Sequence, residues 1–385
     1  MRRAALALVA LLITACSTVS NTLDSLNPFS KSAPKAKPAE LVSFQATAEL
    51  STLWQANVGG AGEFVFTPAV VGKSVYAAAK DGTLARFDEG RLVWRIEAGQ
   101  PLSGGVGADG KLVVVGTAKG EVLAFTATDG KPAWQARASS EVLAAPAVVG
   151  DLVVVRSNDA RLFGFEAADG RRRWVYQRST PPLALRSNVG VTLTDKALYA
   201  GFPGGKLVAI ALHNGAALWE ATVALPRGAT ELERIADVAS EPVLAGELVC
   251  AVAFQGRVAC FDAANGRQAW ARDVSSVAGL DVGERHVYVS DDKGTLHAFD
   301  RATGASLWKQ DKLFMRGLSR PLALGERLVV ADAQGYVHLL AGDDGRFLAR
   351  SSTDGSAVAA PPRPLGPQAF VLQTRAGGLF ALTAR

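Results

Sequence analysis

From residue 44 onward, short apolar stretches alternate with polar turns, and one pattern returns eight times. It consists of glycine, an aliphatic residue two positions later, and a small residue followed by an aromatic or aliphatic one. Its copies, spaced 38 to 51 residues apart, begin at Gly82, Gly120, Ala160, Gly205, Gly256, Gly294, Gly335 and Gly377. Alternation with a period of two predicts half-buried strands. Repeats of about 40–45 residues that hold four short strands indicate propeller blades.

A tryptophan follows each of the first six copies at a fixed place. A turn ends in glycine and the indole comes four residues later, as in Gly90 and Trp94. The six tryptophans of this slot are Trp94, Trp134, Trp174, Trp219, Trp270 and Trp308. An indole repeated in this way is expected to lie between neighbouring blades and to bury a large apolar area. The seventh copy has Ala349 in the slot, so one joint must pack without an indole.

The two ends of the chain complete each other. Trp54 precedes the first copy, whereas the eighth copy ends at Arg385 before it reaches its own slot. A closed ring explains both observations, because the strand around Trp54 would complete the last blade and remove an exposed sheet edge. The sequence therefore predicts an all-β protein. Residues 44–385 would form an eight-bladed β-propeller of four-stranded blades, with the ring closed by the N-terminal strand.

The first residues read as an export signal. Arg2 and Arg3 precede ten apolar residues, 4–13, about half of the length that spans a bilayer. The sequence Ile-Thr-Ala-Cys that ends at Cys16 resembles the lipobox of bacterial lipoproteins. We therefore expect residues 1–15 to be a lipoprotein signal peptide and Cys16 to carry several acyl chains, which together anchor stably. The alternative is an ordinary signal peptide with a chance cysteine.

Residues 16–43 connect this cysteine to the repeats. They are rich in Ser, Pro, Ala and Lys and show no sustained hydrophobic period, which predicts a flexible tether. Ser17 follows the cysteine where aspartate would favour retention in the inner membrane, so the resemblance to the Gram-negative sorting pattern implies the outer membrane.

Composition and charge narrow the possible partners. A hydrophobic content of 49% excludes a disordered chain, and three cysteines exclude a disulfide scaffold. The net charge of +5 is carried largely by the N-terminal part, since 36 basic and 34 acidic residues remain in 44–385. No basic face of the kind that binds nucleic acid is expected.

Candidate chemistry outside the repeats is sparse. Cys250 and Cys260 flank the turn at residues 255–256, and they can form a cross-strand disulfide in an oxidising compartment or remain two buried thiols. His297 and His338 occupy the same slot of neighbouring repeats, but no third ligand is evident, so we expect packing roles and no metal site. No nucleotide-binding or hydrolase motif fits its structural context, and no cofactor is expected.

The two longest repeats are consecutive, and their extra residues fall in 176–188 and 222–241, between blades. Long loops on a rigid scaffold commonly carry function. The first insertion holds prolines and leucines with little reason to be exposed. In the second, Thr230 and Glu233 match a capping box and predict a short helix through Asp237. Apolar residues beside Arg and Asp are typical of an interface hot spot, although loops that merely cover the rim are the alternative.

The tryptophan repeats distinguish between propeller families. No tryptophan is followed by aspartate, which argues against WD40 repeats. The segment from Ala298 to Trp308, with Asp300 and Gly304 between them, resembles the tryptophan-docking repeats of quinoprotein dehydrogenases and of the BamB family. Quinoprotein dehydrogenases are usually longer and carry adjacent cysteines, whereas Cys250 and Cys260 are ten positions apart.

From the lipobox to Arg385, the chain resembles the BamB family, the propeller lipoproteins of the outer-membrane β-barrel assembly (BAM) machinery. The likeness is most specific in PLALR (182–186), TELERIADV (230–238) and the stretch 333–347. It implies a non-enzymatic scaffold without a cofactor at the periplasmic face of the outer membrane. Such a scaffold binds BamA and other BAM subunits, assists insertion of β-barrel proteins, and could hold unfolded outer-membrane clients at its blade edges.

In that family both inserted loops dock on the periplasmic POTRA domains of BamA. The matching positions are Leu183, Leu185, Arg186 and Asp237. The family often has a second acidic residue two positions beyond Asp237, where this chain has Ala239. The alternatives are a quinone-dependent dehydrogenase and a periplasmic propeller that binds a small ligand in its axial channel.

Overall fold

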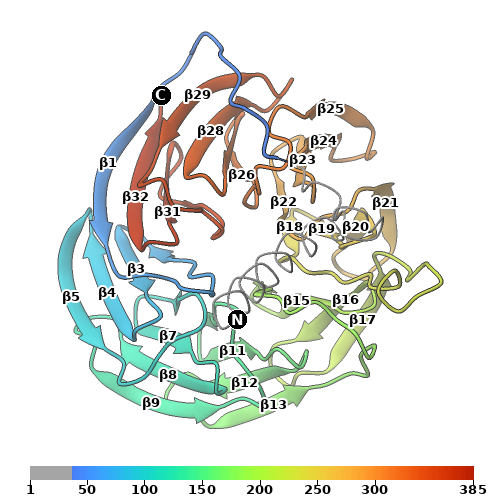
Figure 1. The fold of residues 1–385 in the computed structure, drawn as a ribbon. Helices are drawn as coiled ribbons and strands as arrows, with labels where there is room; N and C mark the ends of the chain where they lie inside the picture. Colours follow the sequence, from blue (N-terminus) through green and yellow to red (C-terminus); the bar gives the residue numbers. More distant parts are fainter. Residues whose placement is uncertain (1–36) are drawn as a thin grey trace, which may run out of the picture. The chain divides into compact units, whose positions relative to one another are not determined.

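The computed structural model describes residues 37–385, of which Ala39–Arg385 form one compact unit. Thirty-two strands form eight four-stranded antiparallel sheets, and these described residues contain no helix. The sheets are arranged as a ring of blades (Figure 1). The prediction of an all-β, eight-bladed propeller is confirmed. The expected signal peptide, Cys16 and most of the expected tether lie outside the described residues.

We number the blades in chain order, and within each the strands run from the axis to the rim. Blades 1 to 4 are β2 (Ala69–Val71), β3 (Ser74–Ala78), β4 (Thr83–Asp88), β5 (Arg91–Glu97); β6 (Gly107–Ala108), β7 (Leu112–Gly116), β8 (Glu121–Thr126), β9 (Pro132–Arg137); β10 (Ala147–Val149), β11 (Leu152–Arg156), β12 (Leu162–Glu166), β13 (Arg172–Tyr176); and β14 (Thr192–Leu193), β15 (Ala197–Phe202), β16 (Lys206–Ala211), β17 (Ala217–Thr222).

Blades 5 to 8 follow the same plan, except that the last blade takes its outer strand from the N-terminal side. They are β18 (Val243–Ala245), β19 (Leu248–Val252), β20 (Arg257–Asp262), β21 (Gln268–Asp273); β22 (Gly279–Val282), β23 (His286–Ser290), β24 (Leu296–Asp300), β25 (Ser306–Gln310); β26 (Leu322–Leu324), β27 (Arg327–Ala331), β28 (Tyr336–Ala341), β29 (Phe347–Ser352); and β30 (Arg363–Pro364), β31 (Ala369–Gln373), β32 (Gly378–Ala384), β1 (Leu50–Asn57).

The ring closes by pairing its first strand with its last. β1 runs antiparallel to β32, with Leu50 opposite Ala384 and Asn57 opposite Gly378. Figure 1 shows the blue β1 beside the red β32. The predicted closure by the N-terminal strand is confirmed. It supplies backbone partners to β32, which would otherwise be left as an open edge.

Seven of the eight joints between blades are built in the same way. The indole of one blade lies against the turn glycine of the next, so that a Cβ added to Gly304 would come within 2.5 Å of Trp270. The six repeat tryptophans also donate their indole N–H to a carbonyl of the next blade, at 2.7–3.1 Å. Trp54 lies against Gly90 of blade 1. Each indole is thus fixed by packing and, at six joints, by a hydrogen bond.

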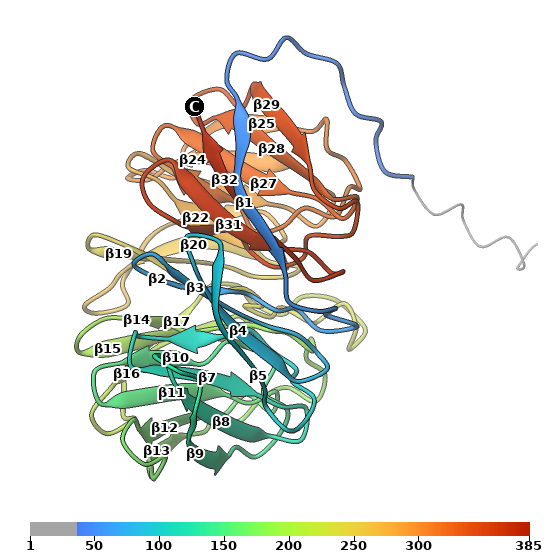
Figure 2. The same cartoon turned by 90° about the vertical axis from the view of Figure 1, so that its left-hand side faces the viewer.

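The joint between blades 7 and 8 lacks an indole, and an N-terminal strap, residues 39–48, covers it. Phe44 of the strap stacks on Phe347 with ring centroids 5.4 Å apart, and the Arg350 guanidinium lies 5.0 Å from the Phe44 ring. Ala48 of the strap packs against the cluster that contains the buried Ala349. In Figure 2 this segment is the blue chain that precedes β1. The segment assigned to a tether up to residue 43 is therefore structured from Ala39.

One local prediction is wrong, because residues 230–237 do not form a helix. The capping box does form, since Thr230 Oγ1 accepts the Glu233 N–H at 3.2 Å and Glu233 Oε2 accepts the Thr230 N–H at 3.0 Å. The turn then stops, because Val238 donates its N–H to the carbonyl of Phe202 in blade 4. A single nucleated turn does not propagate when the next residues are held by another sheet.

Within residues 37–385, no helix offers the length and apolar character needed to cross a bilayer.

Candidate partner-binding site

The two inserted loops lie next to each other around blade 4. They connect β13 to β14 and β17 to β18 over 15 and 20 residues, and are longer than the other inter-blade connections. Each inter-blade connection joins an outer strand to the next inner strand, and the strands alternate in direction. All these connections therefore lie on one face of the ring, which we call the loop face. We call residues 177–191 and 223–242 the first loop and the second loop.

Asp237 joins the two loops from beneath. Its side chain is buried, and its two oxygens accept the backbone N–H of Leu185 at 2.7 Å and of Gly204 at 3.0 Å. The half-buried Arg156 lies nearby: desolvation lowers the pKa of Arg156 to about 10, while the negative charge of Asp237 opposes this shift. Asp237 therefore positions the first loop over blade 4 and does not present its own carboxylate at the surface.

The first loop presents Leu183 and Arg186 at the surface. Leu183 is 43% exposed, whereas Leu185 is half-buried. Arg186 makes a two-point ion pair with Glu141, with Nε and one terminal nitrogen at 3.0 and 3.2 Å from its oxygens. The hydrogen bonds that Arg186 donates to the Glu141 carboxylate raise the pKa of Arg186 above its ordinary value. The guanidinium also lies 5.7 Å from the Phe64 ring, so it is held in one place while half of it faces solvent.

Two exposed leucines of the second loop were not predicted as site residues. Leu225 and Leu232 are 59% and 68% exposed, the largest exposed fractions of any leucine in the described part of the chain. The signal was present in the sequence, because a leucine inside the polar turn Thr230–Arg234 has no strand in which to be buried. Leu183, Leu225 and Leu232 are therefore exposed apolar side chains of the two inserted loops, and Leu183 lies three residues from the charged Arg186 in the sequence.

Ala239 bears on the charge of this surface. It is buried and lies on the wall of the axial channel, not on the outside of the loop. The position at which the resemblance predicts a second acidic residue is therefore buried in this chain.

The other candidate residues are not brought to this site. Cys250 and Cys260 lie directly opposite each other on β19 and β20 and are joined as a disulfide. His297 and His338 each contact an aspartate of their own hairpin, Asp291 and Asp332, at 2.9 and 3.0 Å. No group of three or more His, Cys, Asp or Glu side chains that could hold a metal occurs in residues 37–385.

Comparison with known proteins gives a consistent family. Residues 80–310 match the family profile described as outer membrane protein assembly factor BamB. The assembly factor BamB of Bordetella pertussis is 43% identical, over 94% of each chain. BamB of Pseudomonas aeruginosa is 41% identical, over 100% of this chain and 99% of its own.

Solved structures agree on the ring. BamB from Moraxella catarrhalis superposes with a TM-score of 0.81 at 26% identity, covering 87% of this chain and 100% of its own. Quinohemoprotein alcohol dehydrogenase from Comamonas testosteroni superposes with a TM-score of 0.70 at 13% identity, covering 87% of this chain and 76% of its own. The second likeness concerns the fold alone.

Proposed function

Since the chain belongs to the BamB family of outer membrane protein assembly factors, we propose that it is a non-enzymatic scaffold subunit of the BAM complex. It binds the periplasmic POTRA domains of BamA through the loop face and assists the folding and insertion of β-barrel proteins. Its likeness to quinone-dependent dehydrogenases extends to the propeller fold, whereas the relatives that match at 37–43% identity over most of the chain are named assembly factors.

The observation that carries this proposal is the construction of the loop face. Asp237 ties both inserted loops to blade 4, and Glu141 with Phe64 fixes the Arg186 guanidinium. Leu183 is left exposed beside it. A preorganised arginine next to an exposed leucine is suited to a protein interface, since little conformational entropy is lost on binding.

Co-purification of BamA from detergent-solubilised membranes tests the site. We expect Arg186→Glu to reduce the recovered BamA at least tenfold, because the reversed charge loses its pairing and repels Glu141. The matched control is Arg267→Glu, which reverses an exposed arginine in the turn between β20 and β21, on the face of the ring opposite the loop face. Equal recovery with Arg186→Glu and the wild type would remove the loop face from the interface.

The anchor forms a second part of the proposal. Signal peptide removal after residue 15 leaves Cys16 as the lipidated first residue, and the chain up to the strap tethers the ring to the periplasmic face of the outer membrane. We expect Cys16→Ser to move the protein from the outer-membrane fraction to the soluble periplasm. Retention of the Cys16→Ser variant in the outer-membrane fraction of cells lacking BamA would contradict a lipid anchor.

A further inference from the structure

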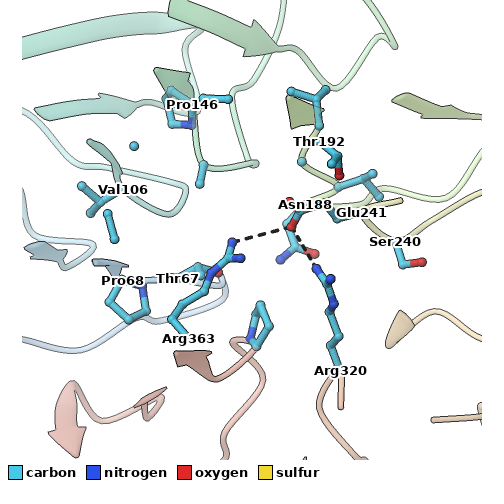
Figure 3. A pocket seen from close by; sticks show the side chains of 18 of the residues that line it. Thr67, Pro68, Val106, Pro146, Asn188, Thr192, Ser240, Glu241, Arg320 and Arg363 are labelled. Atoms are coloured by element: carbon cyan, nitrogen blue, oxygen red, sulfur yellow. Dashed lines mark hydrogen bonds and ion pairs between the residues drawn. The ribbon is translucent and has the colours of Figure 1, made fainter. Parts of the chain in front are cut away.

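The axis of the ring contains a cavity of about 520 Å³. Its wall is formed by the innermost strand of each blade, or by the residues just before that strand (Figure 3). This volume falls within the range of about 300–1,000 Å³ that is typical of small-ligand sites. The cavity lies apart from Leu183 and Arg186, so it is not part of the surface proposed to bind BamA.

One side of the cavity carries its charged groups. Glu241 Oε2 lies 3.0 Å from a terminal nitrogen of Arg320 and 3.6 Å from a terminal nitrogen of Arg363. Arg320 is engaged further, because its Nε donates to the Leu280 carbonyl at 2.8 Å and Asp281 lies 3.8 Å from its other terminal nitrogen. Glu241 thus contacts two guanidinium groups. Of these, the Arg320 guanidinium is already engaged at all three of its nitrogens.

Arg363 has few partners of its own. Among residues 37–385, the Arg363 guanidinium makes the 3.6 Å contact with Glu241 and no hydrogen bond. Arg320, in contrast, donates two hydrogen bonds, at 2.8 and 3.0 Å. Figure 3 shows Arg363 extending into the cavity with Glu241 ahead of it. Most of its five N–H donors therefore face the open volume, in a fork that matches a carboxylate.

The opposite side of the cavity is apolar. Blades 1 to 3 contribute no charged side chain to the wall, which includes Pro68, Val106 and Pro146. These three residues lie across from Glu241 and Arg320 in Figure 3. A ligand that satisfied both sides would have an anionic end and an apolar body.

We propose that the axial cavity binds a small organic monocarboxylate, whose carboxylate pairs with Arg363 and whose apolar body lies against blades 1 to 3. A monoanion suits the site better than a dianion, because Glu241 remains beside the bound group and would repel a second negative charge. This activity is separate from the scaffold role and does not depend on it.

Valerate is a suitable probe, and saturation-transfer NMR on the detergent-solubilised full chain at pH 7.5 can follow its binding. We expect saturable binding that Arg363→Gln weakens at least tenfold. Arg375→Gln removes the same charge from an exposed position outside the cavity and should leave the affinity unchanged. Pentanamide, the uncharged analogue, and succinate, a dianion, should each bind at least tenfold more weakly than valerate.

Three results would overturn the proposal: no saturable valerate signal, equal binding by Arg363→Gln and wild type, or equal binding of valerate and pentanamide. In the last two cases Arg363 would serve only to hold Glu241 across the axis. Co-purification of BamA should be the same for Arg363→Gln and wild type, which keeps a failure of this proposal distinct from a failure of the scaffold role. An unchanged near-ultraviolet circular dichroism spectrum would show that the variant is folded.

Discussion

Two regions of the ring depart from the repeat: the joint between blades 7 and 8, and the two inserted loops around blade 4. Another segment of the same chain covers the first region, whereas the second region stays exposed. At the first, Ala349 takes the place of an indole, and Phe44 and Ala48 of the strap cover the joint. At the second, the inserted loops leave Leu183 and Leu232 exposed. We call the covered joint the filled departure and the exposed loops the open departure. The filled departure contributes to the stability of the ring, whereas the open departure leaves apolar side chains available to a partner.

At the filled departure, a buried network of polar side chains lies under the strap and binds it. Asp332 accepts hydrogen bonds from Arg316 Nε at 2.6 Å and from His338 Nε2 at 3.0 Å, and Arg350 Nε donates to His338 Nδ1 at 3.2 Å. The two arginines end on strap carbonyls, those of Ala39 at 2.9 Å and of Val42 at 3.1 Å. The strap therefore has a defined register, and its attachment is specific as well as apolar.

Asp237→Ala should give the largest effect, because it should lower the stability of the ring and also displace the inserted loops of the open departure. The substitution leaves the N–H groups of Leu185 and Gly204 without their acceptor and the half-buried Arg156 without a nearby negative charge. We expect a loss of about 3 kcal/mol in the free energy of unfolding, measured in urea, together with weakened BamA binding. Glu326→Ala removes an exposed carboxylate in the turn between β26 and β27, on the opposite face of the ring, and is the control that should change neither. A loss below about 0.5 kcal/mol would show that Asp237 does not position the loops.

Phe44→Ala should affect the filled departure alone. It removes the stack on Phe347 and the contact with Arg350, and we expect a loss of about 2 kcal/mol in unfolding free energy. Leu53→Ala, which truncates an exposed side chain on β1, should cost less than about 0.5 kcal/mol. If both substitutions cost the same, the joint between blades 7 and 8 would be stable without the strap.

The network under the strap should make the same joint sensitive to acid. Burial lowers the pKa of His338 below its ordinary value, so the unfolded chain binds a proton more readily than the folded one. Stability should therefore be highest above about pH 6.5 and fall by about 1 kcal/mol towards pH 5.5. Urea unfolding at several pH values measures this slope. His338→Gln should flatten it, and His213→Gln, at an exposed turn, should not; an equal slope in all three proteins would assign the proton to another group.

The repeat made the ring predictable, because seven of the eight joints reuse one local pattern of glycine and tryptophan. The strap was not predicted, because its contacts are far apart in the sequence. Phe44 stacks on Phe347 at the other end of the chain, and residues 39–48 have no hydrophobic period that predicts this contact. The sequence also did not show which site residues are exposed and which are buried. Asp237 looked like an exposed binding residue, but in the structure both of its oxygens accept backbone N–H groups, those of Leu185 and Gly204. The expected helix failed because Val238 pairs with blade 4 instead of extending the turn.

The most direct test of the account measures the affinity of the detergent-solubilised protein for the POTRA domains of its own BamA in two variants, together with their stability. Arg186→Glu should weaken binding at least tenfold while changing the unfolding free energy by less than about 0.5 kcal/mol. Phe44→Ala should lower the unfolding free energy and leave the affinity unchanged. If Arg186→Glu bound like the wild type, or if Phe44→Ala lost affinity to the same extent, the division between a filled and an open departure would be contradicted.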